Sequence, residues 1–156
     1  LSRATRPLAS HRDGLRHEQD PQSWLDAVDA TIAEVGARDL AGIAICSTSG
    51  TFLLTDRNSH PVTPALMYDD ARAAARRDQI VDADPARWST AMQPTWALPK
   101  ILELVAAGYD LAEHRVVDQA LLAAEIAAVE GHPDVLPVAA CPYVVSRFMS
   151  RCALEP

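Results

Sequence analysis

The segment between Ala41 and Arg72, AGIAICSTSGTFLLTDRNSHPVTPALMYDDAR, holds the pattern that decides the fold. It begins with an apolar run, Ala41–Cys46, which is short enough for a buried strand. A small polar patch follows at residues 47–51, and then a second apolar run, Phe52–Leu54. The pattern predicts two strands joined by a polar loop.

A turn and a returning strand are predicted after the second run. Residues 56–60, DRNSH, favour a turn, because Asp and Asn side chains bond to their own backbone and Asn tolerates positive φ. Residues 62–68 would then form the returning strand of a hairpin. Pro61 and Pro64 predict that this strand lies near an edge of the sheet, because proline cannot donate to a central ladder.

Asp69 and Asp70 are predicted to open a helix over residues 69–81, DDARAAARRDQIV. Carboxylates favour a helix N-terminus, and the alanines that follow have high helix propensity. The pair does not indicate general acid–base chemistry, since adjacent residues at a helix start point in different directions. The predicted unit is strand, polar loop, hairpin and helix.

Another helix is predicted before this unit, over residues 22–36. Asp20 suits its N-cap, Pro21 its first position and Gly36 its C-cap. The apolar side chains at helical spacing are Trp24, Leu25, Val28, Ile32 and Val35. We expect this stripe to face a core.

The other segments show weaker patterns. A helix is predicted from Ala97 to Ala107 and ends at Gly108, with an apolar face formed by Leu98, Ile101, Leu102 and Val105. The remaining segments are a strand-like stretch at 1–10, a loop at 11–20, a short helix start at 84–88, a strand at 115–119, a helical pattern at 120–129 and an apolar run at 135–140. Residues 141–156 show no clear periodicity.

Composition limits the class of protein. A length of 156 residues suits one domain with a real core, and 49% hydrophobic with 22% charged residues predicts a soluble globular protein. The formal net charge of -7 argues against nucleic acid as a main partner. No apolar run is long enough to span a bilayer and no signal-peptide layout is present, so no membrane association is expected.

The three cysteines, Cys46, Cys141 and Cys152, lie far apart and form no C-x-x-C pair. This spacing favours reduced thiols over a disulfide framework or a zinc site. We therefore expect a cytoplasmic location.

The predicted unit of strand, polar loop, hairpin and helix, which we call the organising unit, resembles the FGGY family of carbohydrate kinases, and the pentulose kinases in particular. The family pattern LLD-x-x-G-x-P-(L/V)-x-P-A-I-x-W-x-D-x-R is matched without a gap by Leu54, Asp56, Pro61, Val62, Pro64, Ala65, Leu66, Tyr68, Asp70 and Arg72. Residues 4–8, ATRPL, resemble the family's early strand, and residues 17–24, HEQDPQSW, resemble its helix entry. No motif is specific alone, but the three occur in the family's order over about residues 1–100.

The resemblance implies an α/β fold of the ribonuclease-H/actin-like kind, with a mixed β-sheet flanked by helices. Residues 1–120 would form a partial N-terminal kinase lobe, and residues 121–156 a divergent or truncated helical remainder of the same lobe. The hairpin in the organising unit would supply the antiparallel pairing.

The resemblance also implies a set of substrate-binding residues: Thr48, Ser49, Gly50, Asp70, Arg72 and Trp96. Relatives often carry long side chains where Ser49 and Gly50 stand here, so the floor of the pocket would be roomier. Each residue has a structural alternative. The Ser/Thr loop could be a tight turn that bonds to itself, Asp70 and Arg72 a local ion pair at a helix start, and Trp96 a core residue. Lys100 matches a lysine-bearing helix of the family, and no catalytic or metal-binding residue is predicted.

Full-length relatives transfer the γ-phosphoryl group of ATP to a hydroxyl of a small sugar or sugar alcohol, a pentulose foremost, with Mg²⁺. The resemblance implies ATP and Mg²⁺ for the full-length family, but we expect neither to bind this chain tightly. The phosphate-binding Asp-x-Gly motif, the catalytic aspartate and the adenine-binding lobe of the family find no counterpart in it. The chain alone is therefore expected to bind sugar without turning it over.

Two hypotheses of other classes stay open. One is a non-catalytic interaction or structural domain that keeps part of the kinase-lobe fold and forms a homodimer through exposed lobe surface. The other is an α/β protein whose Ser/Thr loop binds a small anion.

Overall fold

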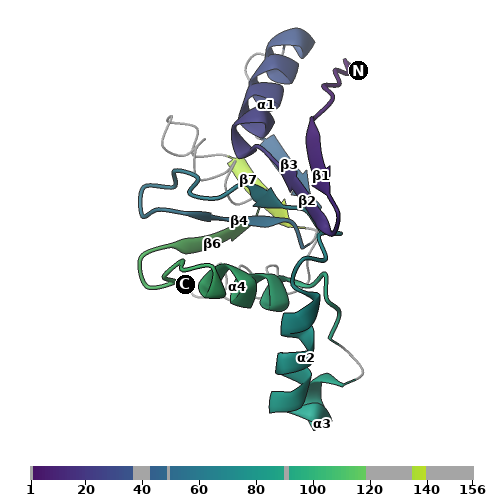
Figure 1. Cartoon of the computed structure of the whole chain (residues 1–156). Coiled ribbons are helices and arrows are strands. Elements are labelled where there is room, and N and C mark those ends of the chain that lie inside the picture. Colours follow the sequence, from purple (N-terminus) through teal and green to yellow (C-terminus); the bar gives the residue numbers. More distant parts are fainter. Residues whose placement is uncertain (1, 37–42, 49, 90–91, 119–134, 140–156) are drawn as a thin grey trace, which may run out of the picture.

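The computed structural model describes residues 2–36, 43–48, 50–89, 92–118 and 135–139. The strands are β1 (Ser10–Asp13), β2 (Arg16–Gln19), β3 (Ile43–Ser47), β4 (Phe52–Thr55), β5 (Ala65–Leu66), β6 (Arg115–Asp118) and β7 (Val135–Ala139). The helices are α1 (Pro21–Val35), α2 (Ala74–Ala83), α3 (Pro85–Trp88) and α4 (Ala97–Ala106). Figure 1 shows α1 and α4 on opposite sides of the larger sheet, with α2 and α3 extending beyond α4.

The larger sheet has the strand order β1-β2-β5-β4-β6, and each neighbouring pair in it is antiparallel. β4 pairs Phe52 with Leu66 of β5 on one side and with Asp118 of β6 on the other. β3 and β7 form a separate parallel pair, with Ile43 opposite Val135. The predicted α/β class is therefore confirmed, and among the described strands the parallel and antiparallel pairings lie in two sheets.

Both faces of β4 are buried, because helices cover the larger sheet from two sides. The apolar side chains of one face are Leu53, Ala65, Met67 and Val117, and they pack with Trp24 at the start of α1. Those of the other face are Phe52, Leu54 and Leu66, and they pack with Leu104 of α4. Successive side chains of a strand point to opposite faces, so the run Phe52–Leu54 supplies both cores.

The predicted turn after β4 is confirmed, and it is built on Asp56. The Oδ1 atom of Asp56 accepts hydrogen bonds from Asn58 N at 2.8 Å and His60 N at 2.9 Å. The positive φ falls on Ser59, at 66°, instead of on Asn58. One carboxylate thus organises the connection by accepting backbone amides, as its sequence position predicts.

The returning strand is shorter than predicted and lies inside the sheet. β5 holds only Ala65–Leu66, between β2 and β4, so the prediction of an edge strand is wrong. Pro61 and Pro64 precede the paired residues of β5, where they remove no bond from its ladder. The hydroxyl of Thr63 accepts the N–H of Leu54 at 3.0 Å, which satisfies a strand amide that faces this segment.

A hairpin occupies residues 10–19, where the sequence pattern predicted a loop. β1 and β2 pair antiparallel from Ser10 opposite Gln19 to Asp13 opposite Arg16. Gly14, at φ 56°, permits the tight connection between them. The strands consist of polar residues, so they lack the apolar alternation that marks a half-buried strand. The strand expected at residues 4–8 is not formed there.

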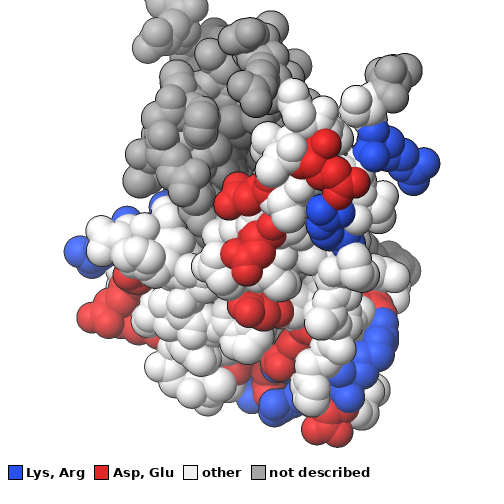
Figure 2. All heavy atoms as spheres, turned by 90° about the horizontal axis from the view of Figure 1, so that it is seen from above, with Lys and Arg blue, Asp and Glu red and all other residues white. Residues whose placement is uncertain are grey.

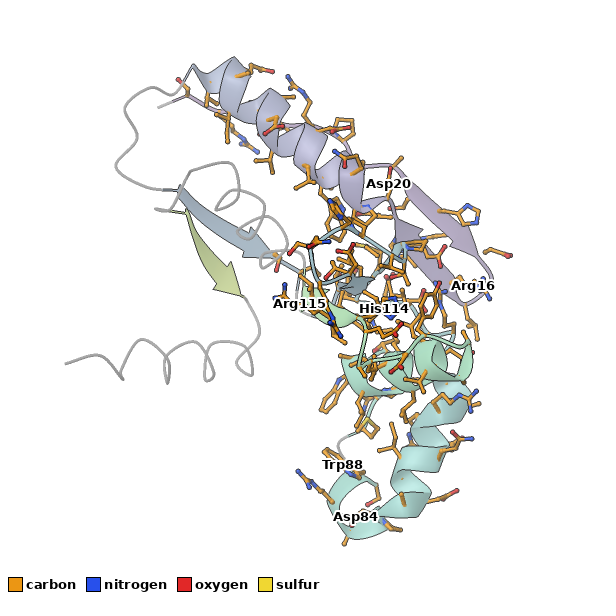
Figure 3. The ribbon with its side chains drawn as sticks, turned by 90° about the vertical axis from the view of Figure 1, so that its left-hand side faces the viewer. Arg16, Asp20, Asp84, Trp88, His114 and Arg115 are labelled. Carbon is orange, nitrogen blue, oxygen red and sulfur yellow. The ribbon has the colours of Figure 1, made fainter. Side chains whose placement is uncertain are left out.

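The helix predicted over residues 22–36 is confirmed as α1. Asp20 Oδ1 accepts the N–H of Gln22 at 3.0 Å, Pro21 occupies the first turn, and Gly36 ends the helix at φ 62°. Figure 3 shows Asp20 at the start of α1 and Asp84 at the start of α3, where Asp84 is the cap. Both caps follow from the local sequence.

The helix predicted from Asp69 and Asp70 begins later, so that prediction is wrong. α2 starts at Ala74, and no side chain caps it. Asp70 is fully buried, and Asp69 pairs with side chains of the β1–β2 hairpin. Carboxylates that are engaged by distant partners are not available to cap the helix that follows them.

The apolar face predicted for α4 is only partly right. Ile101 packs against the core, but Leu98 and Val105 are 39% and 42% exposed. The buried side chains of α4 are Pro99, Lys100 and Leu104. A lysine therefore takes a core position that apolar periodicity does not assign to it.

Several predictions concern residues outside the described ranges. They are the helical pattern at 120–129, the tail at 141–156, the boundary near residue 120 and the substrate-binding role of Ser49. These stay predictions. Only β7 is described beyond residue 118, and it pairs with β3.

The surface of the described part carries mixed charge. Figure 2 shows acidic and basic side chains close together on the face seen from above. Arg6 pairs with Glu34 of α1, and Arg12 of β1 pairs with Asp69. No helix in the described ranges combines the length and the apolar character needed to cross a bilayer.

The two-sided burial of β4 predicts a contrast between two leucines. Leu53→Ala should lower the free energy of unfolding by about 3 kcal/mol or more, because it leaves a cavity at a fully buried site. Leu98→Ala removes the same atoms from a side chain that is 39% exposed, and should cost less than about 1 kcal/mol. Urea unfolding followed by circular dichroism measures both. Equal losses would contradict the packing described above.

Candidate functional site

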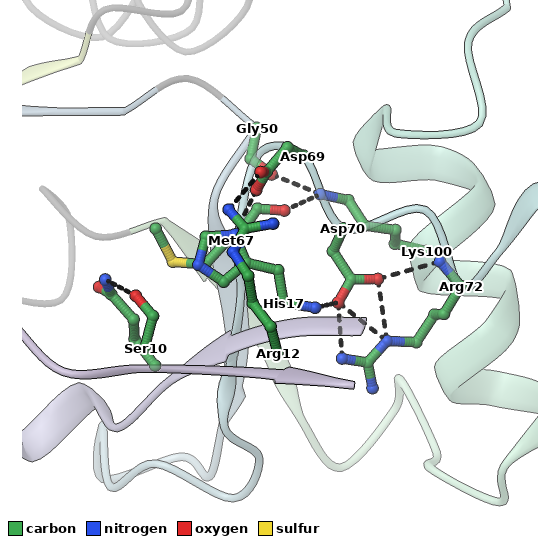
Figure 4. A network of polar contacts seen from close by, with 10 residues as sticks. Ser10, Arg12, His17, Gly50, Met67, Asp69, Asp70, Arg72 and Lys100 are labelled. Carbon is green, nitrogen blue, oxygen red and sulfur yellow. Dashed lines mark hydrogen bonds and ion pairs between the residues drawn. The ribbon is translucent and has the colours of Figure 1, made fainter. Parts of the chain in front are cut away.

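A network of polar groups joins distant segments beside the larger sheet, as Figure 4 shows. The segments are the β1–β2 hairpin, the loop before β4, the turn after β5 and the start of α4. We call these residues the polar network: Arg12, His17, Glu18, Gly50, Met67, Asp69, Asp70, Arg72 and Lys100. The network brings together groups that are far apart in the sequence.

Lys100 is the only lysine of the sequence, and it is fully buried. Its Nζ donates to Gly50 O at 2.7 Å and to Met67 O at 2.9 Å (Figure 4). The same atom lies 5.4 Å from the centre of the Phe52 ring. Burial lowers the pKa of Lys100 to about 8, against the attraction of nearby carboxylates, of which Asp70 has the larger effect. A buried amine thus bonds to two backbone carbonyls that lie 17 residues apart in the sequence.

Asp70 is fully buried and uses both carboxylate oxygens. Arg72 donates from Nε to Oδ1 at 2.9 Å and from Nη2 to Oδ2 at 2.6 Å, while His17 N donates to Oδ2 at 2.8 Å. Arg72 Nη2 also pairs with Glu18 at 2.6 Å. Burial acts to raise the pKa of Asp70, but the bonds from Arg72 and His17 outweigh it and lower the pKa. Asp70 therefore ties β2 to the turn as an anion.

His17 and Asp69 form a second pair in the network. His17 Nδ1 pairs with Asp69 Oδ1, and Arg12 Nη2 donates to Asp69 Oδ2 at 2.7 Å. Burial acts to raise the pKa of Asp69, but the bonds from Arg12 and His17 lower the pKa to about 2. The ionised carboxylate only accepts, so Nδ1 carries the proton of this contact. The buried Nε2 of His17 has no hydrogen-bond partner in the described part of the chain.

Three accessible side chains adjoin the polar network: Thr48, Tyr68 and Trp96. Thr48 is exposed, Tyr68 is 51% exposed and Trp96 is 47% exposed. Trp96 is the N-cap residue of α4, one helical turn before Lys100. A hydroxyl group and half-exposed aromatic rings beside fixed polar groups are suited to a ligand with hydroxyls and an apolar face.

The described residues do not fit a Mg²⁺ site. Among them, no three His, Cys, Asp or Glu side chains gather closely enough to hold a metal ion. Asp69 and Asp70 are engaged by Arg12, His17 and Arg72. The ATP and Mg²⁺ that the family resemblance implies therefore have no ligands assigned in this part of the chain.

Three of the predicted substrate-binding residues belong to the polar network. They are Gly50, Asp70 and Arg72, and the local Asp70–Arg72 ion pair that was the structural alternative is present. The burial of Asp70 favours a role as organiser of the surface over direct contact with a sugar. Gly50 contributes its carbonyl, while its φ of 80° suits glycine.

The other predicted residues lie beside the network or outside the description. Thr48 is exposed, and its carbonyl accepts the N–H of Thr51 at 3.3 Å, so the loop does form a turn. Trp96 is half exposed, so its interpretation as a core residue is wrong. Ser49 lies outside the described residues. Thr48 and Trp96 are accessible to a ligand.

Sequence reasoning missed the roles of His17, Asp69 and Lys100 in this network. His17 was interpreted only as part of a helix entry, because the polar β1–β2 hairpin has no apolar signal. Asp69 was interpreted as a helix cap. Lys100 had a readable signal, since a lone lysine among the apolar residues of a helix pattern indicates a buried amine with partners.

Lys100 predicts a specific pH dependence of stability. Below pH 8 both the folded and the unfolded chain hold the ammonium, and above about 10.5 both hold the neutral amine. Between these values the unfolded chain binds the extra proton, so stability rises with pH. The free energy of unfolding of the wild type should rise by about 3 kcal/mol relative to Lys100→Met over this range. Urea titrations at a series of pH values measure it, and parallel curves for the two proteins would contradict it.

The buried anion at Asp70 predicts a second effect. Asp70→Asn should destabilise the chain by about 3 kcal/mol, because it leaves the Arg72 cation without its buried partner. The loss should shrink as the pH falls below 3.8, the ordinary pKa of aspartate, because the unfolded wild type then takes up a proton that the folded chain, with its lowered Asp70 pKa, does not bind. Asp56→Asn is the matched control in an exposed turn, and its loss should be smaller. Equal losses in urea unfolding would show that burial of Asp70 is unimportant.

No protein-family profile matches the chain. Curated relatives named xylulose kinase match part of it. The one from Streptomyces coelicolor is 30% identical over 71 residues, which are 44% of this chain and 15% of the relative. The one from Arthrobacter sp. is 36% identical over 67 residues, which are 42% of this chain and 68% of the relative.

A solved structure extends the likeness to the fold. The crystal structure of a protein described as a "xyloylose kinase" from Brucella ovis has a TM-score of 0.61 and 22% sequence identity, covering 72% of this chain and 25% of that chain. This likeness agrees with the predicted ribonuclease-H/actin-like lobe. The chain thus spans 15% of the length of the Streptomyces coelicolor relative and a quarter of the Brucella ovis chain. On the match to the Arthrobacter relative, the chain belongs to the xylulose kinase family of carbohydrate kinases.

Proposed function

We propose that this chain supplies the sugar-binding part of a carbohydrate kinase whose substrate is a pentulose. In such an enzyme the γ-phosphoryl group of ATP passes to a sugar hydroxyl, and Mg²⁺ would neutralise charge on the phosphates. The chain spans a small share of its longer relatives, so the activity of the whole protein is part of this proposal. We also place the protein in the cytoplasm, because its three cysteines have no pairing pattern.

One observation supports this function above the others. Lys100 bonds to both the loop that follows β3 and the turn that follows β5, and accessible hydroxyl and aromatic side chains adjoin these segments. Thr48 offers a hydroxyl to sugar oxygens, and Trp96 offers a face against which sugar C–H groups can pack. Asp70 accepts its hydrogen bonds from His17 and Arg72, which belong to the same polar network. The network can therefore hold this surface in place without itself binding the ligand.

The residues of this chain would serve binding and orientation. Two carboxylates of the polar network, Asp69 and Asp70, have lowered pKa values and fixed partners, so neither is poised to take a proton from a sugar hydroxyl at neutral pH. We therefore propose that this chain alone binds a pentulose, binds ATP and Mg²⁺ weakly, and does not turn the sugar over.

Sugar binding should be visible by thermal shift. We expect a pentulose such as xylulose, at ten times its dissociation constant, to raise the free energy of unfolding by about 1.4 kcal/mol, with no further rise from MgATP. Trp96→Ala should weaken binding by about tenfold or more, since stacking area is lost. Trp88→Ala is the control, because Trp88 lies on α3 and packs with Arg87 at 4.5 Å, outside the polar network.

The panel would contain xylulose, ribulose, xylitol, arabitol, ribitol, glycerol and glucose, each with and without MgATP. A shift with glucose alone would contradict the pentulose assignment. A shift with MgATP, or sugar-dependent release of ADP above background, would contradict the proposed restriction to sugar binding. No shift with any sugar would reject the function itself.

A second candidate function is a non-catalytic interaction domain. The exposed apolar side chains of α4 favour it, because Leu98 and Val105 are seven residues apart, share one face of the helix and are 39% and 42% exposed. Apolar side chains on one exposed face of a helix are typical of protein interfaces, and a second copy of the chain is the partner we would expect. Sedimentation equilibrium would distinguish the two functions, since a concentration-dependent dimer that binds no sugar supports this alternative.

A further inference from the structure

We propose that Lys100 is a positioning residue. It holds the loop bearing Thr48 at a fixed position relative to the turn bearing Tyr68. The inference rests on the proposed sugar-binding function. Lys100 itself is fully buried, so it would not contact a sugar directly. It would act through the two backbone segments to which it bonds.

The geometry supports this role directly. Lys100 Nζ is 2.7 Å from Gly50 O and 2.9 Å from Met67 O, so one ammonium group reaches both segments. A Cβ atom built on Gly50 would lie 3.9 Å from Cα and Cβ of Tyr68, so only the space of about one methyl group separates the two segments at this point. Gly50 lies two residues after Thr48, and Met67 lies immediately before Tyr68. A displacement of either carbonyl would therefore move an accessible side chain.

Packing alone does not explain a lysine at this position. Lys100 Nζ lies 5.4 Å from the centre of the ring of Phe52, which belongs to an apolar cluster, and a methionine has about the same length as the lysine stem. Burying an ammonium group costs free energy that an apolar side chain would not cost. In return, three N–H donors on one atom can fix two carbonyls at defined distances, which methionine cannot do. Lysine at residue 100 thus fixes the positions of two carbonyl groups at a cost in the free energy of folding.

The protonation state of Lys100 sets the strength of this link. The two bonds that the ammonium group donates are charge-assisted, whereas bonds from the neutral amine carry no charge. Charged groups of the network that face it are Asp69, Asp70 and Arg72 of the turn, with His17 and Glu18 of β2 bonded to them. The carboxylates favour the ammonium, and Arg72 opposes it. Sugar affinity should therefore fall as the pH rises through about 8.

The link can be tested first without any sugar. Because Lys100 is the only lysine, protein labelled with ¹³C,¹⁵N-lysine contains one lysine spectrum, and its Cε signal reports the titration of this amine alone. Hydrogen exchange of the Thr51 and Asp70 amides reports the two segments, since these amides bond to Thr48 O and Met67 O. In Lys100→Met both amides should exchange about tenfold faster or more, because a charge-assisted bond is lost.

The control variant for this experiment is Arg76→Met. Arg76 of α2 bonds to Glu103 of α4 at 2.8 Å, so its loss removes a cation that bonds to the helix of Lys100 without touching the loop or the turn. The Thr51 and Asp70 amides should keep their wild-type exchange in this variant. Amides of α1 serve as an internal reference in every protein.

The second part of the test measures affinity for xylulose at pH 6 to 10. Lys100→Met should weaken binding by about tenfold at pH 7 and lose the pH dependence, while Arg76→Met should match the wild type. Lys100→Arg keeps the charge, so it should bind more tightly than Lys100→Met and should lack the decline near pH 8.

Each outcome decides a different point. Faster exchange together with weaker binding in Lys100→Met supports the proposal. Unchanged exchange, or a lysine signal that titrates near its ordinary value of 10.5, overturns it. Faster exchange with unchanged sugar affinity also overturns it, because Lys100 would then serve the fold alone. A wild-type protein that binds no sugar rejects the proposed function, and this is seen before any variant is made.

Discussion

The burial of β4 on both faces is the constraint on which the described structure depends. Leu53 packs toward Trp24 of α1, and Leu54 packs toward Leu104 of α4, so a single strand anchors both layers of helix. Its neighbours in the sheet, β5 and β6, are positioned by pairing with it. The loop that ends at Gly50 leads directly into this strand, so its position follows from the same packing.

Buried charged side chains fix the relative positions of segments that apolar packing alone does not fix. Asp70 and Lys100 have opposite charges, both are fully buried, and each is bonded to groups from other segments. Apolar packing tolerates small shifts, whereas hydrogen bonds to a carboxylate or an ammonium require defined distances and directions. The polar network therefore determines how the loop before β4, the turn after β5 and the start of α4 lie relative to one another.

Features formed between neighbouring residues were predictable from the sequence. The caps of α1 at Asp20 and Gly36 and the turn at Asp56 depend on contacts within a few residues, and each occurs where its residue type predicts it. The polar β1–β2 hairpin and the central position of β5 were not predictable, because they depend on pairing between strands without apolar alternation. The helix predicted from Asp69 failed for a related reason, since distant partners had already engaged that carboxylate.

The sequence by itself determined the α/β class, the bounds of α1, the apolar run of β4 and the likeness to sugar kinases. Only the tertiary structure decided the roles of Asp70 and Lys100. The sequence places Asp70 at a helix start and Lys100 in a helix pattern, and the structure gives each of them a partner from another segment. A buried charge takes the partners that the fold brings within hydrogen-bond distance, and sequence neighbours do not specify which partners those are.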